Sequence, residues 1–192
     1  MMSLVRFLIV VAIFATSLAA WHNPLSSRDS KITSAALAFT VIADFFLLIT
    51  HNYEAGLFAF IFVQIMYNLR YNGLKPAVAA SLAAAVTALS FFALGLDMLM
   101  SLALAYAVLF GFSLAAAFRS VASNKYPCPN NYLIIVGMTF YAICDVFVAI
   151  LNSNTEFALR HTYAIAFLVW LFYAPGKFML ALSSFKFGGE NK

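Results

Sequence analysis

Two aspartates occupy equivalent positions in two apolar segments of the sequence. Asp44 lies within Phe39–Ile49 and Asp145 within Phe140–Ile150, and the two segments share Phe, Ile, Asp, Phe and Ile at the same five offsets. An aspartate at the centre of a membrane helix costs roughly 2.5–3.5 kcal/mol on insertion scales, and such a residue usually marks a functional site. Two carboxyls at one depth could act as general acid and general base. We therefore interpret both as candidate catalytic residues.

The composition indicates that these two carboxyls lie on long apolar helices. Of the 192 residues, 65% are hydrophobic and only 9% are charged, and the mean hydropathy is +0.94. Soluble domains average about 25% charged residues. The apolar runs approach the roughly 20 residues that a helix needs to cross a bilayer, without the ten-residue alternation of membrane barrels. We predict an all-α fold, a polytopic transmembrane helix bundle.

The predicted bundle forms a single integral membrane domain over residues 1–192 and has about seven helices, with eight possible. The third run is short for a span, although tilting or extension to Tyr53 and Tyr71 would accommodate it. The predicted helices are 4–21, 32–50, 55–70, 76–96, 98–118, 132–151 and 162–183.

The first apolar run has two interpretations. It could be a cleaved signal peptide with Ser17-Leu18-Ala19 as the cleavage sequence. We prefer a retained first helix, because the basic residues Arg28 and Lys31 flank its far end and outnumber Arg6.

The basic residues predict the orientation. Most of them fall in alternate loops on one side of the bundle, and the opposite side carries only Arg6 and Arg160. The positive-inside rule therefore places the N-terminus outside and the C-terminus in the cytoplasm. We expect a multi-pass protein of the cell membrane if the source is bacterial. The net charge of +4 is dispersed through loops, so no nucleic-acid partner is expected. The residues on the basic side are Arg28, Lys31, Arg70, Lys75, Arg119, Lys125, Lys186 and Lys192, with Lys177 near it.

Helical periodicity predicts that both aspartates face the bundle interior. At 100° per residue, Phe39, Ile42, Phe46 and Ile49 form one stripe and Asp44 projects from nearly the opposite side. The corresponding residues around Asp145 repeat this pattern. We expect the two aspartates at one level, roughly 18–20 Å from the start of their helices.

Several polar residues are candidate substrate-binding groups. Gln64, Tyr67 and Asn68 share one face of the third helix, and Tyr141 precedes Asp145 by one turn. Tyr173, in the last helix, is a further candidate. Polar side chains also hydrogen-bond between membrane helices as packing contacts, so this structural role is an alternative for each of them.

Other features are interpreted structurally. Lys177 lies close enough to the cytoplasmic end of its helix to reach the interface. Tyr106 and Ser113 lie on one side of the fifth helix, which we interpret as scaffold. Ala77, Ala80, Ala84 and Ala88 form one face of the fourth helix and predict close helix packing there. Cys128 and Cys144 are too few and too differently placed for a disulfide framework, and no metal or cofactor is predicted.

The two aspartate blocks, in their order, resemble the lysoplasmalogenase (YhhN-like) family of integral membrane proteins. The resemblance covers most of the chain from Lys31 to Ser183. It is carried by Lys31-Ile-Thr-Ser, Ala43-Asp44-Phe45-Phe46-Leu47-Leu48, Gly56-Leu57-Phe58-Ala59-Phe60, Gln64-Ile65-Met66-Tyr67, Gly137-Met138-Thr139-Phe140 leading to Asp145, Phe172-Tyr173 and Leu182-Ser183. Many relatives are drawn with eight spans where we count seven, and Lys177 matches no family motif.

The resemblance implies hydrolysis of the vinyl ether bond of lysoplasmalogens, which releases a fatty aldehyde and glycerophosphocholine or glycerophosphoethanolamine. It places the functional aspartates at Asp44 and Asp145. One carboxyl would donate a proton to carbon while the other orients water. Gln64, Tyr67 and Tyr173 would orient the ether oxygen or the glycerol, and Arg70 or Arg160 could attract the phosphate. The partners would then be a lysophospholipid substrate and the lipid bilayer; no oligomeric state is predicted.

Two other function classes remain open from the sequence. A small-solute or proton-coupled transporter would also use two acidic residues in repeated membrane helices, but it needs a water path to both faces. A retinal protein is suggested by Lys177 in the last span, although the third helix has no aspartate to serve as counterion.

Overall fold

The computed structural model describes residues 2–153 and 155–187, and within them the chain forms eight α-helices. Seven are long and correspond to the seven predicted runs, which confirms the all-α fold. The eighth, α7, is a short helix at Glu156–Arg160. The long helices are α1 (Met2–Ala19), α2 (Ser27–Phe45), α3 (Tyr53–Asn72), α4 (Pro76–Phe92), α5 (Met98–Ala122), α6 (Asn130–Leu151) and α8 (Thr162–Leu182).

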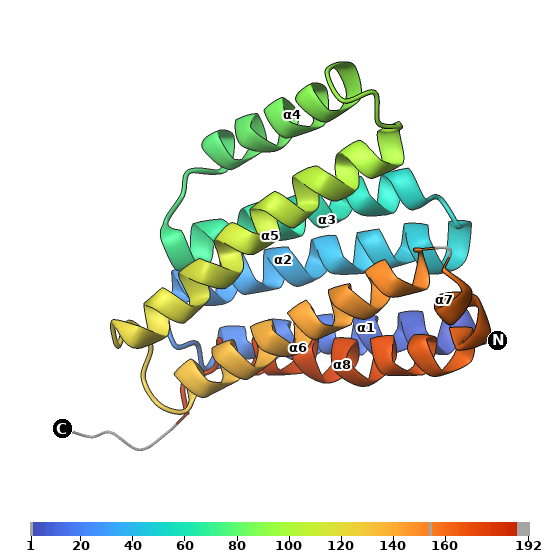
Figure 1. Cartoon of the computed structure of the whole chain (residues 1–192). Helices are drawn as coiled ribbons and strands as arrows, with labels where there is room; N and C mark the ends of the chain where they lie inside the picture. The colour runs from blue at the N-terminus through green and yellow to red at the C-terminus, as the bar shows by residue number, and fades with distance from the viewer. Residues whose placement is uncertain (1, 154, 188–192) are drawn as a thin grey trace.

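Five of the described helices are long and apolar enough to cross a membrane. These are α1 with a 3-10 turn at its end, α2 with a π-helical extension, α5, α6 and α8. The helix α4 has only 17 residues. The helix α3 is less apolar because it carries polar side chains that the bundle buries, among them Gln64, Asn68 and Arg70. The chain is therefore a multi-pass membrane protein, and α3 and α4 lie beside the other helices in alternating direction (Figure 1).

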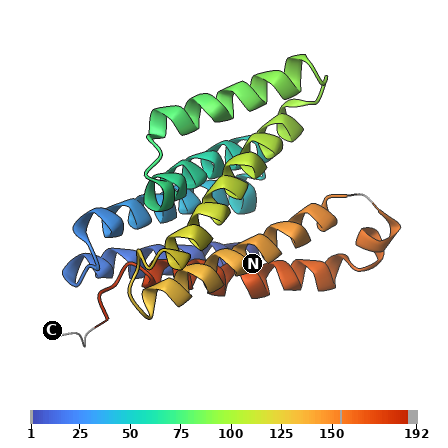
Figure 2. The ribbon, with the colours of Figure 1, turned by 60° about the vertical axis from the view of Figure 1, so that its left-hand side comes forward.

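The helix α8 contacts both helices that carry the aspartates. It packs along α6 and also contacts α1 and α2, while α3 joins α2 to α5. The helix α4 lies at the edge of the bundle against α5 and α3, as Figures 1 and 2 show. The helices α2 and α6 run in the same direction (Figure 1), as the repeated aspartate segments predict. The bundle therefore presents both aspartate helices to α8.

Some helix boundaries differ from the predicted ones. The helix α2 begins at Ser27 rather than residue 32, because a polar first turn with Asp29 near the helix start favours the helical N-terminus. The helix α4 ends at Phe92 rather than residue 96, before Gly95, whose φ of 67° lies in the left-handed region.

Lys192, counted among the basic residues, lies outside the described part of the chain. The other basic loop residues lie at the end of the bundle where α2, α4 and α6 begin.

The predicted packing face of α4 is wrong. Ala77, Ala80, Ala84 and Ala88 are all exposed. The helix is buried instead through the face that contains Ala79, Ala83 and Ser90. Alanine occurs on both sides of this helix, so small size alone did not distinguish the side that contacts α3 and α5.

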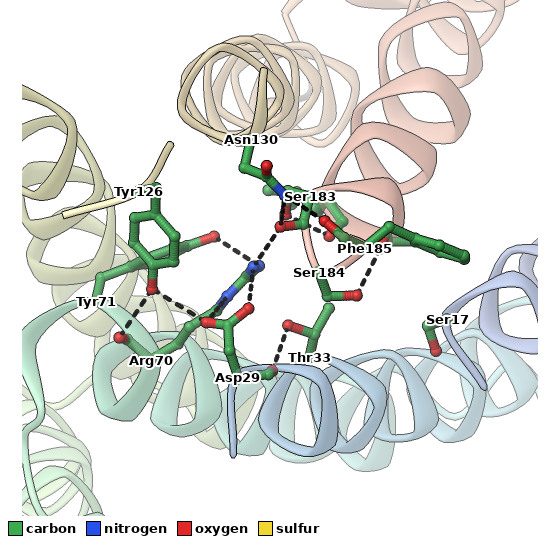
Figure 3. Close-up of polar contacts among 12 residues, drawn as sticks. Ser17, Asp29, Thr33, Arg70, Tyr71, Tyr126, Asn130, Ser183, Ser184 and Phe185 are labelled. Carbon is green, nitrogen blue, oxygen red and sulfur yellow. Dashed lines mark hydrogen bonds and ion pairs between the residues drawn. The ribbon is translucent and has the colours of Figure 1, made fainter. Parts of the chain in front are cut away.

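A buried ion pair, which we call the basal ion pair, fastens the end of the bundle where α2 and α6 begin (Figure 3). Arg70 donates from Nε to Asp29 Oδ1 at 2.9 Å and from Nη2 to Asp29 Oδ2 at 2.8 Å. The Tyr126 hydroxyl donates to Asp29 Oδ1 at 3.1 Å. The Ser183 carbonyl, beyond α8, accepts from Arg70 Nη2 at 3.3 Å and from Asn130 Nδ2 at 2.9 Å. Four helices and the loop between α5 and α6 are thereby joined.

Tyr126 lies in that loop, outside the helices, where its surroundings keep it a hydrogen-bond donor. Burial raises the pKa of its hydroxyl well above the ordinary value. The group therefore stays protonated over the whole physiological range, and its bond to Asp29 persists.

The helices α6 and α8 approach each other closely at two glycines. A Cβ atom on Gly137 would lie 2.9 Å from Leu180 Cγ and 3.0 Å from the Gly176 carbonyl oxygen. A Cβ atom on Gly176 would lie 3.1 Å from the Gly137 carbonyl oxygen. Small residues permit this backbone approach in membrane bundles, and here it holds α8 against the helix that carries Asp145.

We expect Gly137→Ala to lower the free energy of unfolding by about 1–3 kcal/mol, because an added methyl group overpacks the contact between α6 and α8. Gly111→Ala in α5 is the matched control, since no described residue beyond its own stretch of helix lies within 4 Å of its Cβ position. That change should be neutral or stabilising by up to about 1 kcal/mol, as alanine is the better helix former. Denaturant unfolding in detergent measures both. Equal effects of the two variants would contradict the close-contact explanation.

Candidate functional site

Asp44 faces the bundle interior from the last turns of α2. Its side chain is 4% exposed, whereas Ile42 and Ile49 of the apolar stripe are exposed on the outer surface. The Tyr173 hydroxyl of α8 donates a hydrogen bond to Asp44 Oδ2 at 2.5 Å. The predicted inward orientation is therefore confirmed, and Tyr173 is its direct partner.

The backbone changes from α to π geometry two residues after this aspartate, at Phe46. The π-helical segment Phe46–Thr50 ends at His51, which has a left-handed φ of 56°. Short π segments inside helices frequently occur at functional sites. Helical backbone thereby extends six residues beyond Asp44, to Thr50.

Asp145 is held by a second tyrosine. Its carboxyl is partly buried, and the Tyr106 hydroxyl of α5 donates to its Oδ2 at 2.7 Å. The Tyr106 hydroxyl also lies 2.9 Å from the Tyr141 hydroxyl. Because Tyr106 has one hydroxyl proton and directs it to the carboxyl, the proton between the two tyrosines comes from Tyr141.

A chain of polar side chains extends from Tyr141 into α3 and α5. Gln64 Nε2 donates to the Tyr141 hydroxyl at 3.3 Å, and Ser113 Oγ donates to Gln64 Oε1 at 2.8 Å. The chain therefore runs from Ser113 through Gln64, Tyr141 and Tyr106 to Asp145. It fixes the direction in which each tyrosine hydroxyl points.

The other two candidates on α3 differ in their contacts. Asn68 Nδ2 donates to the backbone carbonyls of Gln64 and Leu109, which is a packing contact between α3 and α5. Tyr67 is fully buried, and its hydroxyl has no hydrogen-bond partner among the described residues. Tyr67 therefore retains a free donor and acceptor inside the bundle.

The expectation that Lys177 reaches the cytoplasmic interface is wrong. The residue is 0% exposed, and Nζ lies 3.3 Å from the centroid of the Tyr141 ring. The rings of Phe60, Tyr67 and Tyr173 lie 5.4–5.7 Å from Nζ. Side chains tilt toward the N-terminus of their helix, and that end of α8 is the end nearer the aspartates. The lysine therefore extends away from the interface that it was expected to reach.

The two aspartates lie at matched positions and share this lysine. Asp44 is six residues before Thr50, where the helix ends, and Asp145 is six residues before Leu151. Each carboxyl interacts electrostatically with the Lys177 ammonium. Within residues 2–153 and 155–187, no hydrogen bond joins the two carboxyls directly. We call Asp44, Asp145 and Lys177 the aspartate–lysine cluster.

Sequence reasoning missed three members of this region. Lys177 was assigned to the interface, and Tyr106 and Ser113 were assigned to the scaffold. The spacing of seven residues that places Tyr106 and Ser113 on one face of α5 was the available signal. Nothing in the sequence showed that this face points toward Asp145 rather than toward lipid.

The two arginines considered for phosphate are both in ion pairs. Arg70 binds Asp29 in the basal ion pair and is 4% exposed. Arg160 donates to Glu156 Oε1 at 2.8 Å on the surface. Neither contacts the aspartate–lysine cluster through a hydrogen bond in the part of the chain that the structure describes.

An apolar groove of about 410 Å³ lies between α1 and α8. It borders the turns of α8 that also carry Tyr173 and Lys177. Its lining residues are Ile9, Ala12, Ile13, Thr16, Ala174, Pro175 and Phe178.

Comparison with known proteins identifies one family. The model of the YhhN family matches residues 1–184, which is nearly the whole chain. No curated protein and no solved structure matches the sequence.

Proposed function

The chain belongs to the YhhN family, and we propose that it is a membrane-embedded hydrolase that cleaves the vinyl ether bond of lysoplasmalogens. The products are a fatty aldehyde and glycerophosphocholine or glycerophosphoethanolamine. Asp44 and Asp145 are the proposed catalytic residues. The observation that carries the proposal is their arrangement: two helices of an apolar bundle each hold one carboxyl inside the bundle through a tyrosine hydrogen bond, and both carboxyls lie near the same buried lysine.

The reaction needs one carboxylic acid and one carboxylate. The acid transfers a proton to the outer carbon of the vinyl ether double bond, and the ether carbon becomes an oxocarbenium ion. Water adds to that carbon while the carboxylate accepts a proton from the water. The resulting hemiacetal then breaks its bond to the glycerol oxygen, which takes the proton that the base had accepted. The hemiacetal hydroxyl gives its proton to the other carboxylate, and the aldehyde leaves. One water molecule is consumed, and both carboxyls return to their starting states.

The tyrosines position the carboxyls for these steps. Tyr173 fixes one oxygen of Asp44 and Tyr106 fixes one oxygen of Asp145, so one oxygen of each carboxyl stays available for the reaction. Gln64 and Tyr141 direct the Tyr106 hydroxyl. We assign Tyr67, whose hydroxyl has no partner in the described part of the chain, to a polar group of the bound lipid. Asn68 stays a proposed binding residue through Oδ1, which has no hydrogen-bond partner among the described residues, while its amide protons bond Gln64 in α3 and Leu109 in α5.

The test is aldehyde release by the purified protein in detergent, with lysoplasmalogens of both headgroups. In heavy water, the released aldehyde should carry one deuterium on the carbon next to the carbonyl, because the mechanism protonates that carbon. Lysophospholipids with the same headgroup and either a 1-acyl or a saturated 1-alkyl chain are the matched controls. Neither control contains the vinyl ether, so neither should yield aldehyde.

Failure to release aldehyde from either headgroup would overturn the hydrolase proposal. The transporter alternative would then be tested by solute or proton uptake into proteoliposomes. Addition of retinal to the purified protein tests the remaining alternative, which predicts a visible absorbance band.

A further inference from the structure

Lys177 is buried in the bundle core and has no hydrogen-bonding partner within residues 2–153 and 155–187. Its side chain is fully buried, and among the described residues no acceptor lies within bonding distance of Nζ. An ammonium has three donors, and burial without compensation is costly. A buried cation persists where opposite charge is close or where aromatic faces surround it.

The surroundings of Lys177 provide both kinds of compensation. The Tyr141 ring lies face-on to Nζ at 3.3 Å, and Phe60, Tyr67 and Tyr173 complete an aromatic enclosure. Asp44 of α2 and Asp145 of α6 lie near enough to interact electrostatically with the lysine, so a carboxylate at either position provides opposite charge. The enclosure therefore offsets part of the cost of burying an ammonium at this position.

Charge balance then limits the ionisation of the aspartates. One ammonium compensates one carboxylate, and a second carboxylate in the same apolar core would be an uncompensated buried charge. With one lysine and two aspartates, the neutral arrangement is one ammonium, one carboxylate and one carboxylic acid.

We propose that Lys177 is a positioning residue that keeps exactly one of the two aspartates ionised, so that the cluster rests with one acid and one base. This proposal deepens the proposed hydrolase function, which requires that combination, but the protonation states can be measured without any activity. The lysine itself forms no bond to substrate in this role.

Other groups near the lysine do not change the balance. Arg6 of α1 lies over the Trp170 ring and forms no ion pair with either carboxyl among the described residues. The remaining titratable groups that face the cluster are uncharged phenol and thiol side chains, namely Tyr67 of α3, Tyr106 of α5, Tyr141 and Cys144 of α6, and Tyr173 of α8.

The decisive experiment is infrared spectroscopy of the protein in detergent at neutral pH, in the region of the protonated carboxyl C=O stretch. The wild type should show the band of one protonated aspartate. In Asp44→Asn and in Asp145→Asn the band should disappear, because the single remaining carboxyl pairs with the ammonium. Lys177→Met should double the band, and Lys177→Arg, which keeps the charge, should leave it unchanged.

Each alternative gives a different spectrum. A band of two carboxyls in the wild type that Lys177→Met does not alter would show a neutral lysine and would overturn the proposal. Absence of the band in the wild type would show two carboxylates and would also overturn it. If Lys177→Met does not fold, the wild type, the two asparagine variants and Lys177→Arg still decide the question.

The activity assay separates this proposal from the proposed function. If the protein hydrolyses lysoplasmalogen, Lys177→Met should lose about a hundredfold or more of the rate, because the base is protonated. Lys177→Arg should retain most of the rate. The spectroscopic result stands even if the protein releases no aldehyde, and in that case only the hydrolase proposal fails.

Discussion

Replacing either Asp44 or Asp145 by asparagine is expected to lower the rate of aldehyde release by about 10²–10⁴-fold, the usual contribution of a general acid or base. Asparagine keeps the shape of the side chain and can still accept the tyrosine hydrogen bond, but it neither donates an acidic proton nor accepts one. The measurement is the initial rate of aldehyde formation per folded molecule in detergent.

The double variant distinguishes a shared mechanism from two separate contributions. Residues that act as one unit give effects that do not add. We therefore expect Asp44→Asn with Asp145→Asn to be about as slow as the slower single variant. A double variant slower by the product of both effects would argue against an acid and base that act in one reaction sequence.

Asp97→Asn is the matched control for this substitution. Asp97 precedes α5 and accepts a hydrogen bond from the Met100 amide as the helix cap. Asparagine caps helices as well as aspartate does, so stability and rate should both remain unchanged. A loss of activity in this variant would show that the assay responds to any removed carboxylate.

The aspartate pair could be predicted from the sequence because two independent patterns agreed. A carboxylate in an apolar helix is unusual by itself, and its recurrence with the same flanking residues made the position of Asp145 predictable from that of Asp44. The apolar stripe opposite Asp44 then gave its direction. Gln64 and Tyr141 were also identified as polar residues on inward faces, and the structure joins them in one hydrogen-bonded chain.

The partners of the aspartates depend on how helices are rotated against each other, which a single sequence does not contain. The position of Lys177 near a helix end suggested the interface, but the tilt of its side chain and the contact of Gly137 with α8 direct it inward. Tyr106 was predictable as one face of α5 but not as the partner of Asp145. The π-helical segment after Asp44 gave no sequence signal, because its residues are equally compatible with an α-helix.

The basal ion pair is a second feature that could not be predicted from the sequence. Asp29 and Arg70 are 41 positions apart; Arg70 was expected on the basic side of the bundle, and Asp29 was given no role. Only the antiparallel packing of α2 against α3 brings the start of one helix to the end of the other. The resulting pair is buried, with the Arg70 side chain 0% and the Asp29 side chain 11% exposed.

We expect Arg70→Met to lower the free energy of unfolding by about 3–5 kcal/mol, because it leaves Asp29 as a nearly buried charge without its partner. Denaturant unfolding in detergent measures the change. Arg160→Met is the control: its ion pair with Glu156 is 71% and 86% exposed, and its loss should cost at most about 1 kcal/mol. Similar losses in the two variants would contradict a special role for burial.

A second substitution identifies the source of the lost stability. In Arg70→Met with Asp29→Leu both charges are absent, so part of the lost free energy should return, since removing a whole buried pair is often nearly neutral. If the double variant is no more stable than Arg70→Met, the contacts of Arg70 with Ser183 and the aromatic rings are responsible instead.

Asp29 is 15 residues from Asp44 along α2, about 22 Å. The rate per folded molecule should therefore stay unchanged in every one of these variants, which separates the fastening of the bundle from the chemistry at its other end.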